Sequence, residues 1–132
     1  MEQDLDPALQ FEVLAAKLRG DHGASEDLLD LLAKMLEGSY PSGTKVARGG
    51  WFMSKQRPVE ELSVRFDEWQ FVIAREKHGT ISARSMKLVK GVSLKTNDIS
   101  MDECIEQIIK EIMKLAERNA QTREALNRFV SG

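Results

Sequence analysis

Hydrophobic residues follow two different periods along the chain, a helical one at both ends and an alternating one in the middle. In 7–19 and 26–37, apolar positions recur at every third or fourth residue, which is the spacing of one helix face. Each range is followed by a glycine, Gly20 or Gly38, a residue that commonly ends a helix. The pattern therefore predicts a helical hairpin within residues 1–38.

The middle of the chain, residues 44–96, has the alternating pattern of half-buried strands. The alternation runs up to Asp67 and Glu68 and resumes after them, so we expect a two-residue hairpin turn there. A glycine and an asparagine are missing from this turn, which makes it a poor match to type I′. The paired strands then place six large apolar side chains on one face: Leu62, Val64, Phe66, Trp69, Phe71 and Ile73.

A third strand of the meander is expected after the glycine-containing connection 77–79. It places small residues, Ala83 and Ser85, under the apolar face, which leaves room for a helix to cross the sheet. Gly91 is expected to bend this strand before a further stretch at 92–94. We therefore predict an antiparallel meander of about four strands.

The C-terminal part, residues 99–130, is predicted to be helical. Ser100 and Glu103 have the spacing of a capping box, which fixes where the helix begins. The apolar stripe lapses after Asn119 and resumes near the end, so the last segment either continues the helix or forms a second one. Its large apolar residues need a surface to contact: Leu126, Phe129 and Val130.

These elements predict one α+β domain over residues 1–132, with the C-terminal amphipathic helix packed on one face of the sheet. A chain of 132 residues with 42% apolar residues has an ordinary size for a single domain. The acidic N-terminus lacks the features of a secretory signal, and no apolar run approaches the ~20 residues of a membrane span. We expect a cytoplasmic protein without a transmembrane segment.

Charge is separated into blocks that the total of −2 hides. Residues 1–43 contain 9 acidic and 3 basic side chains, residues 44–95 contain 5 and 11, and residues 96–132 contain 7 and 5. A basic block of this kind either binds an anionic partner or faces the acidic helices of its own chain. The sequence leaves both interpretations open.

Catalytic, cofactor and metal motifs are missing from the sequence. His22 and His78 lie in glycine-bearing loops without companion ligands, and the Gly-Gly pair at 49–50 lacks the pattern of a phosphate loop. The single cysteine, Cys104, falls in the first turn of the C-terminal helix, where we expect it to be buried and structural. We expect a protein that is not an enzyme and that binds no cofactor or metal.

One candidate binding segment combines large apolar residues with cations. Three large apolar residues in a row cannot all face inward from one strand, so at least one of them is covered by another element or meets a partner. Alternatively, two of them enter the core and the third lies under the hairpin. The segment's candidate residues are Trp51, Phe52, Met53, Lys55 and Arg57.

Two arginines, Arg65 and Arg84, are predicted to lie on the open face of the sheet. The leading hypothesis is a non-catalytic protein-interaction module, such as an adaptor, assembly factor or small regulatory subunit that self-associates. The alternative is binding of nucleic acid or another polyanion through the basic sheet and its loops. An acidic pI of about 5.7 and aromatic residues on the core side both favour the first hypothesis.

Overall fold

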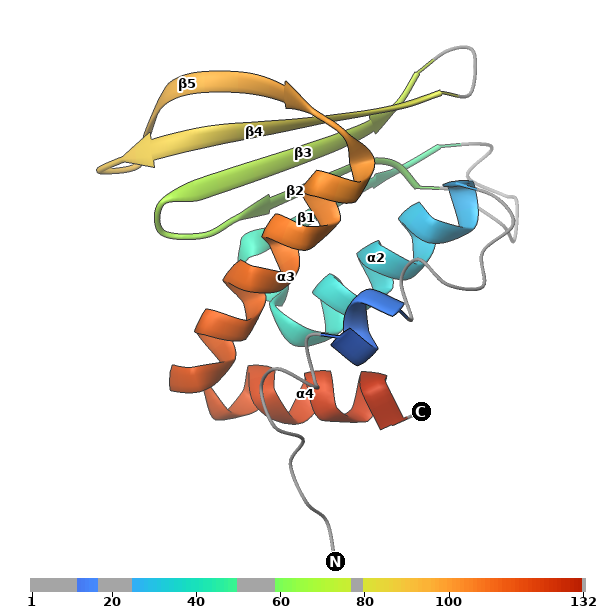
Figure 1. Ribbon diagram of the computed structural model, residues 1–132, viewed down its shortest axis with the longest axis vertical. Helices are drawn as coiled ribbons and strands as arrows, with labels where there is room; N and C mark the ends of the chain where they lie inside the picture. The colour runs from blue at the N-terminus through green and yellow to red at the C-terminus, as the bar shows by residue number, and fades with distance from the viewer. Residues whose placement is uncertain (1–11, 17–24, 50–58, 77–79, 132) are drawn as a thin grey trace, which may run out of the picture.

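The chain forms a five-stranded antiparallel sheet with helices on one face, as the computed structural model in Figure 1 shows. The structure describes residues 12–16, 25–49, 59–76 and 80–131. The predicted α+β class is confirmed. The strands follow one another in chain order across the sheet: β1 (Thr44–Arg48), β2 (Val59–Arg65), β3 (Trp69–Arg75), β4 (Ile81–Val89) and β5 (Val92–Ile99).

The predicted pairing of the central strands is confirmed residue by residue. In β2 and β3, Leu62 lies opposite Ile73 and Val64 opposite Phe71. In β3 and β4, the register places the small residues Ala83 and Ser85 under the same face. The β2–β3 turn is closed by a 2.7 Å hydrogen bond that the Phe66 N–H donates to the Trp69 carbonyl.

The turns differ from one another in backbone conformation. Neither Asp67 nor Glu68 has a positive φ, so the β2–β3 turn is not type I′. Lys90 and Gly91, in contrast, have φ values of 52° and 82°, the conformation of a type I′ turn. The chain therefore reverses at Gly91 instead of bending there as predicted, and the sheet has five strands instead of about four.

Helices α2 (Ser25–Ser39) and α3 (Met101–Arg118) pack against the sheet, and α4 (Ala120–Ser131) lies on their far side (Figure 1). The amphipathic α3 thus lies where the sequence predicted it. A short 3-10 helix, η1 (Pro41–Gly43), connects α2 to β1. Residues 12–16, within the first helix expected of the hairpin, are helical.

The helix ends follow local hydrogen bonding. The Ser100 hydroxyl accepts from the Glu103 N–H at 3.1 Å, which confirms the predicted start of α3. Asn119 has an extended backbone and its side chain accepts from the Thr122 N–H at 3.1 Å, so α4 is a separate helix. Helix α2 passes Gly38 and ends at Ser39, whose hydroxyl donates to the Met35 carbonyl at 2.7 Å.

The core lies between the sheet and the helices. Its fully buried members include four of the predicted inward residues, Leu62, Val64, Phe71 and Ile73, together with one face each of α2 and α3. Trp69, also predicted to face inward, is half-buried at the border of this core. This burial supplies most of the free energy that holds the layers together. The largest fully buried side chains are Leu14, Leu29, Leu32, Met35, Leu36, Leu62, Phe71, Ile73, Ile105, Ile108 and Ile109.

Candidate functional site

The segment with the strongest aromatic signal lies outside the described residues. Its role in partner binding therefore stays a prediction, as does the alternative of burial in the core. His22 and His78 also lie outside the described residues, so their expected positions in loops stay predictions. The residues concerned in the segment are Trp51, Phe52, Met53, Lys55 and Arg57.

The start of β2, where the chain returns from this segment, is firmly anchored. Val59 is buried, and its N–H donates to Oδ1 of Asp30 on α2 at 3.2 Å. The Val59 carbonyl accepts two hydrogen bonds from the Arg75 guanidinium, at 3.1 and 3.0 Å. These contacts fix the first residue of β2 beside α2.

Arg65 and Arg84 lie on the open face of the sheet, as the register predicted, but in different surroundings. The Arg65 guanidinium donates to the Gly91 carbonyl at 2.5 Å, which ties it to the tip of the β4–β5 hairpin. Arg84 lies directly opposite Asp98 of β5. The two cations therefore do not combine into one basic cluster.

The apolar residues at the C-terminus are accounted for by the core. Leu126 is buried, and Phe129 and Val130 pack against the core cluster. Part of the first helix is covered as well, because Leu14 and Ala15 are buried. These segments therefore provide less exposed apolar surface for a partner than their sequence suggested.

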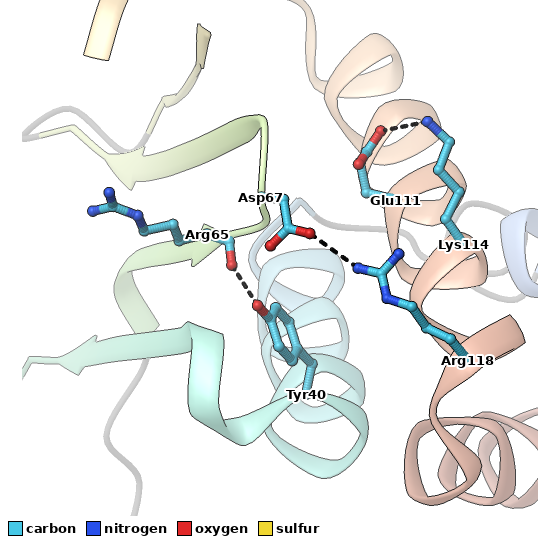
Figure 2. A network of polar contacts seen from close by, with 6 residues as sticks. All are labelled: Tyr40, Arg65, Asp67, Glu111, Lys114 and Arg118. Atoms are coloured by element: carbon cyan, nitrogen blue, oxygen red, sulfur yellow. Dashed lines mark hydrogen bonds and ion pairs between the residues drawn. The ribbon is translucent and has the colours of Figure 1, made fainter. Parts of the chain in front are cut away.

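Tyr40 follows α2 and joins it to the sheet within the polar network drawn in Figure 2. Its ring stacks on Phe66 with 5.3 Å between centroids, and its hydroxyl donates to the Arg65 carbonyl at 2.7 Å. Burial and the nearby Asp67 carboxylate raise the pKa of Tyr40, and the Arg118 cation partly opposes them. Arg118 of α3 in turn donates to Asp67 at 3.2 Å.

Two hollows adjoin the Tyr40–Phe66 stack, one of about 330 Å³ towards β1 and one of about 300 Å³ towards α3. Charged groups of both signs line each hollow, for example Lys45 and Asp67 in the first. The Tyr40 hydroxyl is engaged with backbone, and Figure 2 shows the Arg65 guanidinium directed away from Asp67. The network therefore connects helix and sheet and does not gather reactive groups around a cavity.

Cys104 is buried in the first turn of α3, as predicted. Burial, followed by the Glu103 carboxylate, raises the pKa of its thiol to about 12. The thiol therefore stays protonated near neutral pH, which makes it a poor nucleophile. Among the described residues, no group of three or more histidine, cysteine or acidic side chains is placed to hold a metal ion.

Among the described residues, the large apolar side chains that are exposed belong to the β4–β5 hairpin. Val89, Val92 and Leu94 expose 45%, 61% and 65% of their surfaces. β5 is an edge strand, and every residue from Val92 to Asp98 is exposed. Sequence reasoning missed this surface because the turn that creates β5 begins with Lys90, an uncommon residue for a type I′ turn.

The hydrogen-bonding direction of β5 follows from its neighbours. The Leu88 N–H donates to the Glu68 carbonyl at 2.8 Å, so the backbone of Leu88 and Met86 faces the β3 side. Backbone N–H and C=O groups alternate in direction along a strand, so those of Met86 and Arg84 both point to β3. The β5 residues opposite them therefore form no backbone hydrogen bonds with β4. These residues are Thr96 and Asp98, whose N–H and C=O groups therefore point to the free edge of the sheet.

Comparison with protein-family models, curated proteins and solved structures found no match for this chain. In the described part of the chain, no helix combines the length and the apolar character that crossing a membrane requires.

Proposed function

We propose that this protein is a non-catalytic interaction module that binds another polypeptide by adding a strand to the free edge of β5. The proposal rests on the exposure of every residue from Val92 to Asp98. Two of these residues, Val92 and Leu94, are large and aliphatic, and Val89 of β4 is a third exposed aliphatic side chain. A free edge presents unpaired N–H and C=O groups, which an extended segment of another chain can satisfy. Alternate side chains then set which segment is accepted.

Two features of the edge favour a selective partner over indiscriminate pairing. A bulge interrupts the register between Lys87 and Leu88, and Lys95 places a charge on the helix-facing side of β5. Both features discourage edge-to-edge association of sheets in natural proteins. The aliphatic residues Val92 and Leu94 are exposed beside them, and apolar contacts of this kind stabilise an added strand.

The test is to block the edge without disturbing the sheet. Thr96→Pro removes an N–H that points away from β4, so the β4–β5 ladder keeps its hydrogen bonds while an incoming strand loses a donor. The matched control Thr96→Val keeps the N–H and the β-branched shape. We expect proteins captured from native cells by the tagged wild type to be retained by Thr96→Val and lost with Thr96→Pro. Equal capture by both variants would contradict the proposal.

Polyanion binding is the second candidate function, and the row Lys45–Ser63–Val72–Arg84 on the open face supports it. Asp98 at the end of this row reduces the positive potential. Titration of a fluorescent single-stranded oligonucleotide at 20 to 200 mM salt tests this candidate, because phosphate contacts weaken steeply with salt. Affinity that is absent at low salt would eliminate it.

A further inference from the structure

The turn end of the β4–β5 hairpin carries positive charge only. Residues 86–97 contain three lysines, Lys87, Lys90 and Lys95, and no carboxylate. The register places Lys87 directly opposite Lys95. Both side chains are on the helix-facing side, because the neighbouring pair Ser85–Asn97 and the pair Ala83–Ile99 continue that face. Like charges directly opposite one another destabilise a strand pair.

The two lysines differ in their contacts. The Lys87 ammonium lies 4.8 Å from the centroid of the Trp69 ring, in a cation–π arrangement. Lys95 is exposed, and no carboxylate of a described residue forms an ion pair with it. Lys95 is thus an uncompensated cation at the edge where a new strand would pair.

We propose that the strand received by β5 is an acidic, aliphatic segment of a different protein, with a carboxylate beside Lys95 and an aliphatic side chain beside Val92. This inference rests on the proposed function. A carboxylate next to Lys95 compensates this cation, which the β4–β5 ladder places opposite the like charge of Lys87. The aliphatic positions cover surface that is now exposed at Val92 and Leu94.

Charge also argues against a second copy of β5 as the occupant. Two identical antiparallel strands are related by a two-fold axis perpendicular to the sheet, so the same face is shared by both copies. Lys87 and Lys95 of both chains would then gather on one side of the joint. The clustered like charges oppose that dimer and favour an acidic partner.

The probe for this proposal is a fluorescent heptapeptide of alternating valine and glutamate, blocked at both ends and titrated with the full chain. Its matched controls carry glutamine or lysine in place of glutamate. We expect the glutamate peptide to bind about threefold to tenfold more tightly than the glutamine peptide, the range of a few exposed ion pairs. The lysine peptide should bind most weakly.

The charge-swapped variant Lys95→Glu makes the test specific to this site. It should reverse the preference, so that the lysine peptide binds more tightly than the glutamate peptide. The matched control is Lys110→Glu on α3, which should leave the preference unchanged. In the wild type, Lys110 is exposed and lies 3.8 Å from the Glu106 carboxylate. Circular dichroism checks that each variant is folded.

The outcomes separate this inference from the proposed function. If Thr96→Pro abolishes binding of all three peptides and their affinities are equal, β5 receives a strand but the acidic partner is overturned. If the glutamate preference survives Thr96→Pro, the attraction is electrostatic and strand addition fails. If no peptide binds, or sedimentation shows a dimer that Thr96→Pro dissociates, the acidic partner is also overturned.

Discussion

Single residues of this protein are informative where burial changes their chemistry. Cys104 and Thr122 are both buried polar side chains, one with a raised thiol pKa and one with a hydrogen bond to the Ser39 carbonyl at 2.8 Å. Loss of the Thr122 hydroxyl and ionisation of the Cys104 thiol both have measurable effects. Their effects on stability therefore test the packing of α3 and α4 directly.

Ionisation of Cys104 should make the protein less stable in alkali. The thiol pKa is 9.0 when unperturbed and about 12 in the folded chain, so between these values the unfolded state releases a proton that the folded state retains. Stability is then lost as pH rises from 9 towards 12, by up to about 1.4 kcal/mol per pH unit from this group.

Urea unfolding of the wild type and Cys104→Ala at pH 8, 9.5 and 10.5 measures this difference. All other ionisable groups are common to both proteins, so only the difference between the two slopes belongs to Cys104. The variant should be less stable at pH 8 because of the cavity and should lose less stability with rising pH. Parallel pH profiles would contradict the buried, protonated thiol.

Removal of the Thr122 hydroxyl should loosen the contact between α4 and the end of α2. Thr122→Val keeps the shape but leaves the buried Ser39 carbonyl without this donor, which should cost about 1 to 3 kcal/mol of the free energy of unfolding. Thr122→Ser, which keeps the hydroxyl, should lose less. Thermal unfolding compares the three proteins, and equal melting temperatures would mean that the hydrogen bond contributes nothing.

Among the elements, the β4–β5 hairpin depends most on one turn. Lys90 occupies the left-handed region at φ 52°, where a side chain with a Cβ is strained, while Gly91 occupies φ 82° at no steric cost. Lys90→Asn should therefore stabilise the protein by a few tenths of a kcal/mol up to about 1, because asparagine tolerates this conformation. Gly91→Ala should destabilise it by about 1 kcal/mol or more.

Chemical denaturation of these two variants, with hydrogen exchange of the β5 amides, measures the effect. The amides of Lys95 and Asn97, which face β4, should exchange faster in Gly91→Ala and more slowly in Lys90→Asn. The amide of Thr96, which faces the free edge, should exchange rapidly in every variant. Protection of Thr96 equal to that of its neighbours would contradict the edge geometry.

At the scale of the whole molecule, the sheet has one face covered by helices and one open face. The open face mixes Lys45, Arg65 and Arg84 with Glu61 and Asp98, whereas the turn end of the β4–β5 hairpin, residues 86–97, contains lysines and no carboxylate. The described basic residues of the middle of the chain are therefore spread around the sheet instead of forming one groove. This distribution favours contact with an acidic segment at one edge over contact with a long polyanion.

Much of the fold follows from local pattern. The pairing of Leu62 with Ile73 and of Val64 with Phe71 was predictable because a strand alternates strictly, and a shift of one residue would expose its whole apolar face. The cap at Ser100 was predictable because it depends on residues within one turn of the chain. Asn119 carried a similar signal for α4, three residues before Thr122.

The sequence by itself determined the α+β class, the register of the central strands, the start of α3 and the separation of charge, since each depends on neighbouring residues or on composition. Tertiary structure alone decided that Phe129 finds its contacts in the core, that Arg65 is tied to Gly91, and that β5 remains an exposed edge. Burial and edge exposure depend on contacts between residues that are far apart in the sequence, so local sequence patterns do not predict them.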